Sequence, residues 1–256
     1  MKITILTIFP EMFTPLHTSM LGRAERAGLL TIREVDIRAY SKNKHHNTDD
    51  APFGGGAGMV MLAQPIVDAM RDVTGEKFCG KRIFLSPCGE HFTQKKAEEL
   101  AKEKELVFLC GHYEGVDQRA IDLVIDEELS IGDYVLTGGE LGAMVVVDCV
   151  ARLIPGVLGC KSSAETESFS SGLLEYPQYT RPREFEGLIV PEPLLNGNHR
   201  EIENWQLTES LILTLRRRPE MVREWLKGKK FSRAKQRVVD AALERAKKEM
   251  EESFSN

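Results

Sequence analysis

Three glycine-containing loops carry the residue types in this sequence that best suit ligand binding. They are Ser86–Gly89 (SPCG), Gly111–Gly115 (GHYEG) and Ile131–Gly139 (IGDYVLTGG), and we place each at the carboxyl end of a strand. Ligands of open α/β sheets bind beyond these strand ends, and glycine there lets the backbone approach a ligand closely. An ordinary turn explains any one loop equally well. Three loops with the same polarity predict a ligand site.

A fourth glycine cluster, Phe53–Met59 (FGGGAGM), follows Asp49 and Asp50. A flexible backbone beside carboxylates is typical of a mobile loop that contacts substrate, although a plain surface loop explains it nearly as well. The sequence lacks GxGxxG after a strand, a GxxxxGK[ST] phosphate loop, HExxH and GxSxG. His45 and His46 are adjacent and would not converge on one ion, so we expect no metal site.

The elements that must position these loops follow from apolar periodicity. We predict strands at residues 2–9, 31–40, 82–87 and 106–110, and helices at residues 63–73, 93–103 and 144–154. Thr93 suits the N-cap of the second helix, and Pro155 with Gly156 ends the third. Alternating strands and helices indicate an α/β fold with a largely parallel sheet that is covered on both faces.

The composition changes after residue 160. Residues 160–172 (CKSSAETESFSSG) are Ser-rich and almost without apolar side chains, which is typical of a linker. Helical patterns follow at residues 200–215, 219–227 and 232–252. We therefore expect an α/β domain over residues 1–160, a flexible linker over residues 161–172 and a small helical domain over residues 173–256.

Charge is unevenly distributed along the chain. The formal net charge is −5, but Arg216–Arg237 holds ten Lys and Arg against two Glu, a local charge of +8. Such a chain can offer one basic face to a polyanion. A solvated helical surface is the commoner explanation of a charge run, so this segment alone does not identify a partner.

Composition indicates a globular protein of the cytoplasm. The 256 residues are 42% hydrophobic and 29% charged, which argues against wholesale disorder. There is no apolar run of eighteen residues, so we expect no membrane-spanning helix. The start, MKITILTIFPEMF, lacks a signal-peptide cleavage site and predicts a buried strand. Five cysteines without a CxxC pair favour reduced thiols.

A series of motifs then points to a family. In order from Phe9 to His199 they are FPEMF, DDAPFGGGAGM, LSPCG, GHYEG, IGDYVLTGGEL, RLIPGVLG, GLLEYPQYTRP and LLNGNH. Together they closely resemble the bacterial tRNA (guanine-N1)-methyltransferase family, TrmD. The resemblance implies a fold of the SPOUT superfamily with a deep trefoil knot, a homodimer, and methyl transfer from S-adenosylmethionine to N1 of guanosine 37, the nucleotide 3′ of the anticodon in tRNA.

The family's cofactor positions map onto the three loops found above. In this sequence they are Leu85, Ser86, Pro87, Gly111, Tyr113, Glu114, Ile131, Gly132, Asp133, Tyr134, Val135, Leu136, Gly138 and Gly139. Two positions depart from the common family pattern near these loops. Gly142 stands where many members have Pro, and His112 where many have Arg.

The implied reaction requires two further residues. Guanine N1 must lose its proton before it attacks a methyl group, and negative charge then develops on O6. By the resemblance, Glu167 is the general base and Arg152 stabilises O6. The residues alone allow simpler explanations. Arg152 could form an ion pair with Asp148 on the helix surface, and Glu167 could be a solvated carboxylate. Glu165 is an alternative candidate for the base. Many members have Asp in place of Glu167, and the extra methylene shifts the carboxylate by about a bond length.

Recognition of tRNA would combine an extruded target base with contacts to the anticodon stem-loop. The expected substrate-binding residues are Asp50, Gly55, Gly58, Lys42, Lys44, Arg216, Arg217 and Arg218. The family also suggests Mg²⁺, for which the sequence shows no dedicated site. In a homodimer, the linker would bring Glu167 of one chain over the cofactor loops of the other. The alternatives are a methyltransferase for ribosomal RNA and a catalytically silent RNA-binding module.

Overall fold

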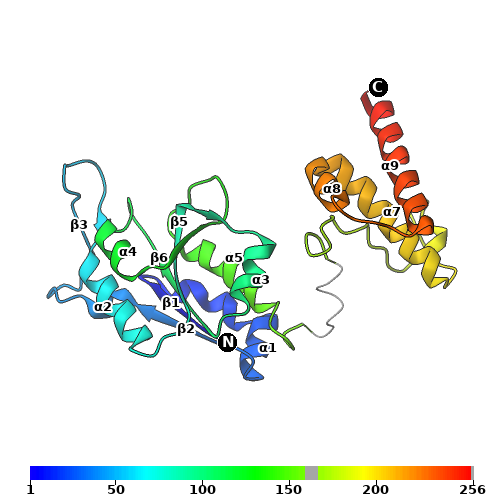
Figure 1. Ribbon diagram of the computed structural model, residues 1–256. Helices are drawn as coiled ribbons and strands as arrows, with labels where there is room; N and C mark the ends of the chain where they lie inside the picture. Colours follow the sequence, from blue (N-terminus) through cyan, green and yellow to red (C-terminus); the bar gives the residue numbers. More distant parts are fainter. Residues whose placement is uncertain (159–166, 255–256) are drawn as a thin grey trace. The chain divides into compact units, whose positions relative to one another are not determined.

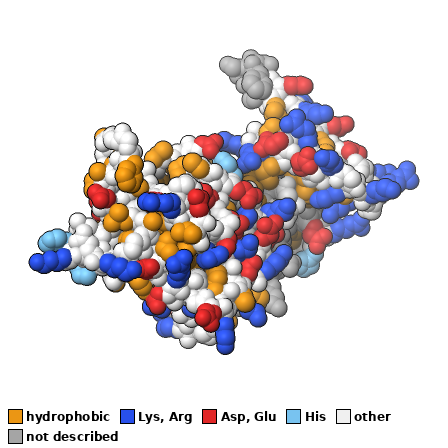
Figure 2. Space-filling model, turned by 60° about the vertical axis from the view of Figure 1, so that its left-hand side comes forward, with side chains coloured by type: hydrophobic (Ala, Val, Ile, Leu, Met, Phe, Trp, Pro, Cys, Tyr) orange, Lys and Arg blue, Asp and Glu red, His pale blue; other side chains and the backbone are white. Residues whose placement is uncertain are grey.

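The computed structural model describes residues 1–158 and 167–254 of the chain. The chain divides into two compact units, Met1–Lys161 and Ser162–Asn256 (Figure 1). Residues 161–166 of the expected linker lie outside the described residues. On the face drawn in Figure 2, acidic, basic and hydrophobic side chains are interspersed.

The first unit is built on a five-stranded, fully parallel sheet with the strand order β2-β1-β6-β5-β7. Its strands are β1 (Lys2–Thr7), β2 (Thr31–Asp36), β5 (Lys81–His91), β6 (Glu105–Cys110) and β7 (Glu127–Ser130). The predicted α/β class and all four predicted strands are confirmed. The fifth strand, β7, escaped prediction because its sequence, EELS, is short and largely polar.

Helices cover both faces of the sheet (Figure 1). One face packs against the 3₁₀ helix η1 (Pro10–His17) and against α1 (Ser19–Arg26), α3 (Gln94–Leu100) and α5 (Glu140–Ala151). The other face packs against η2 (Ile37–Tyr40), α2 (Ala63–Thr74) and α4 (Gln118–Val124). Alternate residues of a strand point to opposite faces, so Phe108 of β6 enters the first core and Leu109 enters the second.

Several element ends differ from the sequence-based expectation. The second strand ends at Asp36 because the Asp36 carboxylate accepts the Arg38 N–H at 2.9 Å and starts η2. The expected helix 144–154 begins four residues earlier, at Glu140. Two short strands, β3 (Asp49–Asp50) and β4 (Val60–Met61), pair antiparallel at the base of the loop that holds the fourth glycine cluster.

The second unit packs α7 (His199–Arg217), α8 (Pro219–Leu226) and α9 (Arg233–Phe254) around a small apolar core that includes Leu173, Leu211 and Trp225. It also holds a short hairpin of β8 (Glu184–Phe185) and β9 (Leu188–Ile189), and the 3₁₀ helix η3 (Glu192–Leu194). Residues 167–172, the described part of the expected linker, form hydrogen-bonded turns of this unit. No described helix of the chain is long and apolar enough to cross a membrane.

Candidate functional site

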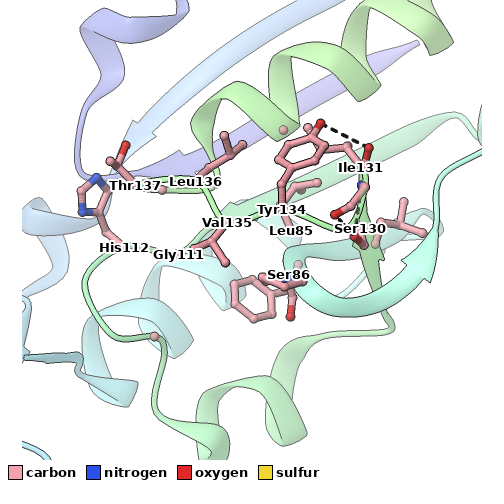
Figure 3. Close-up of a pocket in the computed structure, with 18 of the residues that line it drawn as sticks. Leu85, Ser86, Gly111, His112, Ser130, Ile131, Tyr134, Val135, Leu136 and Thr137 are labelled. Carbon is pink, nitrogen blue, oxygen red and sulfur yellow. Dashed lines mark hydrogen bonds between the residues drawn. The ribbon is translucent and has the colours of Figure 1, made fainter.

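A pocket opens where the three glycine-containing loops meet, beyond the carboxyl ends of β6 and β7 and beside β5 (Figure 3). Parallel strands end at the same edge of a sheet, which brings together loops that are far apart in the sequence. The lining residues are Phe84, Leu85, Ser86, Pro87, Gly111, His112, Tyr113, Glu114, Gly115, Leu129, Ser130, Ile131, Gly132, Tyr134, Val135, Leu136, Thr137, Gly138, Gly139 and Gly142.

The first of these loops differs from its prediction. Ser86–Gly89 does not follow β5 but bulges within it, because the pairing of β5 with β7 shifts between Leu85 and Glu90 and then resumes. A bulge re-aims the backbone locally. Gly89 permits it, since a Cβ atom there would collide with the backbone of Glu128 and Leu129.

Backbone hydrogen bonds join the second and third loops. The Gly139 N–H donates to the Gly111 carbonyl oxygen at 2.8 Å, and His112 pairs with Gly138 in an antiparallel bridge. A Cβ atom on Gly139 would lie 2.9 Å from Cys110 Cα and 3.1 Å from Gly111 N. Glycine at position 139 therefore lets two backbones touch, and this contact forms one wall of the pocket.

Local hydrogen bonds shape the third loop. Ser130 Oγ donates to the Gly132 carbonyl oxygen at 3.1 Å and accepts the Gly132 N–H at 3.2 Å. The Tyr134 hydroxyl donates to the Ile131 carbonyl oxygen at 3.3 Å (Figure 3). The φ angle of Gly132 is +151°, a region that other residues rarely adopt. These contacts hold the Tyr134 ring against the backbone at Gly132.

The lining suits a small organic ligand with both apolar and polar groups. Leu85, Ile131 and Leu136 supply apolar surface, and the glycine peptide groups supply donors and acceptors. A mostly apolar wall with a few polar groups is typical of cofactor sites. A Cβ atom on Gly111 would lie 2.9 Å from the Phe84 ring, so glycine lets the backbone at this position pack directly against the ring. Glu114 is the one acidic residue among the lining residues, and its side chain is exposed.

The structure brings together thirteen of the fourteen expected cofactor residues on this pocket; their role as ligands stays a prediction. The exception is Asp133, whose side chain is 88% exposed and accepts from His91 Nε2 at 2.9 Å. The sequence-based set missed lining residues that flank or interrupt the same loops: Phe84, His112, Gly115, Leu129, Ser130, Thr137 and Gly142. Their closeness in sequence to the predicted residues is the signal that could have included them.

The fourth glycine cluster lies beside the pocket. The Glu114 N–H donates to the Met59 carbonyl oxygen at 3.0 Å, and a Cβ atom on Gly58 would collide with the Glu114 side chain. Burial, and then the charge of Asp49 in the neighbouring hairpin, raise the pKa of Tyr113. The loop therefore reaches two lining residues, Tyr113 and Glu114.

The other expected substrate residues of the first unit lie in exposed positions. Asp50 and Gly55 are exposed, and a Cβ atom on Gly55 would meet nothing within 4 Å. Lys42 pairs with Asp68 at 2.8 Å, and Lys44 is exposed in the loop between η2 and β3. These positions are accessible to a large substrate, and their contacts with one stay a prediction.

The expected catalytic residues belong to different units. Arg152 directly follows α5 in the first unit, and its N–H donates to the Asp148 carbonyl oxygen at 3.2 Å. Glu167 is the first described residue of the second unit. Each unit alone therefore contains one of the two, and their joint action stays a prediction. Glu165, the alternative base, lies outside the described residues.

Two of the three expected phosphate-binding arginines are already paired. Arg216 forms an ion pair with Glu249, and Arg218 forms one with Glu220. Arg217 is exposed. These pairs connect the end of α7 to α9 and to the start of α8, so Arg216 and Arg218 have a local electrostatic role that the sequence pattern did not reveal.

The described residues contain no group of three or more His, Cys, Asp or Glu side chains that could hold a metal ion. The fold and the pocket define an α/β protein with a small-molecule site beyond the carboxyl ends of a parallel sheet.

Comparison with known proteins narrows this class. The chain belongs to the TrmD family, because the family model described as "tRNA (Guanine-1)-methyltransferase TrmD" matches residues 1–224.

Three similar proteins carry the name tRNA (guanine-N(1)-)-methyltransferase. The protein from Halalkalibacterium halodurans is 52% identical over 250 residues, which is 97% of this chain and 100% of that protein. The protein from Alkaliphilus metalliredigens is 57% identical over 228 residues (87% and 92%), and the protein from Clostridium perfringens is 57% identical over 221 residues (86% and 93%). The resemblance predicted from the motifs is confirmed.

Proposed function

We propose that this protein transfers a methyl group from S-adenosylmethionine to N1 of guanosine 37 in tRNA, in the cytoplasm. The observation that carries the proposal is membership of the TrmD family over residues 1–224. The names of the similar proteins describe the same tRNA base and ring nitrogen. The pocket supports the proposal because its apolar walls and glycine backbones suit an adenosine-bearing cofactor.

The bound cofactor would supply an electrophilic methyl group on a cationic sulfur. Leu85, Ile131 and Leu136 provide the apolar contacts for its ring, and glycine at positions 111 and 139 lets the backbone approach it closely. Asp133 and the thirteen lining residues form the proposed cofactor set. Among the described residues no group of three or more His, Cys, Asp or Glu side chains could hold an ion, and we assign no step to Mg²⁺.

The chain's own residues then act on the guanine. Glu167 accepts the N1 proton, and Arg152 stabilises the negative charge that forms on O6. The cofactor would supply its methyl carbon to the N1 electron pair, and the electrons of the carbon–sulfur bond would stay on sulfur. The pocket walls must align these three atoms, so we expect positioning to supply much of the rate.

The proposed active site is shared between two chains. Helix α5 has twelve residues and begins at the pocket, so Arg152 lies about 18 Å along the helix from the pocket loop. An arginine side chain does not span that distance. A homodimer supplies Arg152 and Glu167 from the partner chain instead. Leu141 and Val145, one turn apart on α5, are exposed and support an apolar contact with a second copy.

The remaining assignments follow the family. The α/β domain, residues 1–160, contains the deep trefoil knot of the SPOUT superfamily. Residues 161–172 are the expected linker, of which residues 167–172 form turns of the second unit, and the helical domain, residues 173–256, binds the anticodon stem-loop of tRNA. Asp50, Gly55, Gly58, Lys42 and Lys44 contact this substrate from the first unit, where the Gly58 contact with Glu114 connects the substrate loop to the cofactor pocket.

One assay tests the proposal. Purified protein is mixed with methyl-labelled S-adenosylmethionine and unmodified tRNA transcripts that carry either guanosine or adenosine at position 37. We expect incorporation only with guanosine 37, and mass spectrometry should locate the methyl group on its N1. Incorporation into ribosomal RNA alone would favour the other methyltransferase, and saturable RNA binding without any cofactor binding would favour a silent module.

A further inference from the structure

A buried carboxylate that the proposed reaction does not use lies behind the pocket. Glu140 is 1% exposed, and it is the one buried Asp, Glu, Lys or Arg side chain in the part of the chain that the structure describes. Burying a charge costs free energy, and an apolar residue of similar size is often no worse for stability. This position therefore calls for a reason beyond packing.

Glu140 is connected to the end of β1. Thr7 Oγ1 donates to Glu140 Oε1 at 2.8 Å and accepts the Phe9 N–H at 2.9 Å. A hydroxyl has one proton to donate, and here it is directed at Glu140. Because Thr7 is itself fully buried, the bond fixes the direction of the carboxylate.

The other carboxylate oxygen faces the pocket wall. A Cβ atom on Gly138 would collide with Glu140 Oε2 and would lie 2.5 Å from Cδ2 of His112. Gly138 and His112 both line the pocket, and Gly138 lies close to the carboxylate. Glu140 also interacts with the buried Cys110, whose thiol pKa is raised by burial and further by the charge of Glu140.

We propose that Glu140 is an electrostatic specificity residue, which makes the pocket prefer a positively charged cofactor. This inference rests on the proposed function. S-adenosylmethionine carries a positive charge on sulfur, and its product, S-adenosylhomocysteine, carries none there. A fixed negative charge behind a glycine wall, shielded from water, attracts the first and not the second. Glu140 thereby favours binding of the donor and release of the product.

Two substitutions separate charge from hydrogen bonding. Glu140→Gln removes the charge but keeps an oxygen that can accept from Thr7, and Thr7→Val removes the hydrogen bond but keeps the charge. Calorimetry would measure the affinity of each variant for S-adenosylmethionine and for S-adenosylhomocysteine. We expect Glu140→Gln to weaken S-adenosylmethionine binding roughly five- to tenfold and to change S-adenosylhomocysteine binding less than about twofold. Thr7→Val should change both affinities by the same factor.

The alternative outcomes are distinct. Equal loss for both ligands in Glu140→Gln, or no loss, would overturn the inference and leave Glu140 a purely structural residue. Should Glu140→Gln not fold, the unmodified protein gives a second measurement: sinefungin, which has an amine cation in place of the sulfonium, should bind more tightly than S-adenosylhomocysteine, and equal binding would overturn the inference. If the unmodified protein bound none of the three ligands, the proposed cofactor itself would be wrong.

Discussion

Gly139 shows how a single missing side chain builds the pocket wall. Its φ of −78° is open to any residue, so backbone strain is not the reason for glycine here. The reason is the contact with Cys110 and Gly111, where two backbones leave no room for a Cβ atom. The nearby Gly142 differs, because a Cβ atom there would meet the Leu85 side chain at 3.4 Å and the Ile131 side chain at 3.8 Å, both ordinary contact distances.

These two glycines make a matched pair of substitutions. Gly139→Ala should push the second and third loops apart, weaken S-adenosylmethionine binding at least about tenfold and cost about 1–3 kcal/mol of stability. Gly142→Ala should keep or slightly raise the melting temperature, because alanine favours a helix over glycine. Calorimetry and thermal denaturation check both expectations. Equal melting temperatures and affinities for the two variants would contradict the close backbone contact.

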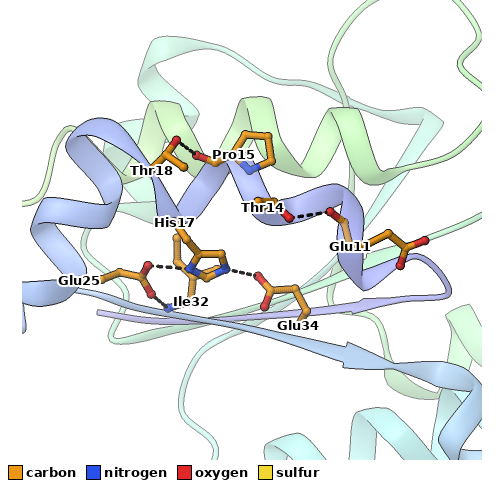
Figure 4. Close-up of polar contacts among 8 residues, drawn as sticks. All are labelled: Glu11, Thr14, Pro15, His17, Thr18, Glu25, Ile32 and Glu34. Carbon is orange, nitrogen blue, oxygen red and sulfur yellow. Dashed lines mark hydrogen bonds and ion pairs between the residues drawn. The ribbon is translucent and has the colours of Figure 1, made fainter.

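His17 is held between two carboxylates (Figure 4). Its Nδ1 donates to Glu25 Oε2 at 2.7 Å and its Nε2 donates to Glu34 Oε1 at 2.9 Å. Ionised carboxylates only accept, so both ring nitrogens must carry protons. Burial lowers the pKa of His17, but hydrogen bonds to Glu25 and Glu34 and their charges outweigh it and leave the pKa raised above 6.5.

A raised pKa predicts a definite pH dependence of stability. The contribution of His17 should be complete below about pH 6.5, the pKa of an unfolded histidine, and should be lost as pH rises through the higher folded pKa. The His17→Gln variant stays neutral throughout, so the stability difference between the two proteins should be larger at pH 6 than at pH 8. Urea unfolding at both pH values measures it. A difference that does not change with pH would show that His17 is not protonated in the folded protein.

At the scale of elements, the basic segment divides into two parts. Arg216 and Arg218 at the end of α7 are paired with carboxylates. The cations of the turn before α9 and of its first turns form no ion pair within the described residues, and they are Lys229, Lys230, Arg233, Lys235 and Arg237. Lys229 Nζ lies 4.2 Å from the centre of the Trp225 ring, and burial and then the charge of Lys235 lower its pKa. An anion would relieve this repulsion.

We therefore expect the turn before α9, and not the end of α7, to meet tRNA phosphates. The double variant Lys229→Gln/Lys235→Gln should weaken tRNA binding and reduce the slope of log K against log[salt] by about 2, roughly one for each lost phosphate contact. The matched variant Arg216→Gln/Arg218→Gln should change the slope less, because these arginines are neutralised within the protein. Fluorescence anisotropy over a salt series measures the slope for both variants. A larger change of slope in the Arg216→Gln/Arg218→Gln variant would show that the end of α7 contacts the phosphates instead.

At the scale of the whole molecule, the position of Arg152 at the far end of α5 from the pocket predicts how mutant chains complement one another. A heterodimer of a Thr137→Trp chain, with its pocket filled, and a Glu167→Ala chain should regain up to about half of the normal methyl transfer. The intact pocket of the second chain meets Glu167 of the first. Arg152→Ala should behave like Glu167→Ala. Methyl incorporation into tRNA by differentially tagged heterodimers is the assay.

The reciprocal heterodimer is the control. One chain carries both substitutions and the other carries none. Shared sites predict no activity, because each site then contains one altered part. Sites built within one chain predict the opposite, with half activity here and none in the first heterodimer. That reversed pattern would refute the shared site.

Much of this fold and site could be predicted from the sequence because the determining signals are local. Runs such as ITILT in β1 and VFLC in β6 are apolar because both faces of the sheet are buried, and that pattern is visible in the chain itself. The glycine loops could be recognised in the same way, since close backbone approach leaves its mark in residue type. Of the fourteen cofactor residues that the family resemblance placed in and beside these loops, thirteen line one pocket.

What the sequence alone did not determine depends on residues that meet only after folding. β7 is a strand because Ile83, Phe84 and Leu85 of β5 pair with it, and EELS has little strand character alone. Asp133 turns out of the pocket toward His91. Arg216 is neutralised by Glu249 on another helix. Glu140 meets Thr7 across 133 positions of sequence. Each of these interactions depends on how far apart two groups lie in the folded protein. The energies of hydrogen bonds and charge pairs vary with that distance and with burial. Neither quantity is specified by residue type or by spacing along the chain.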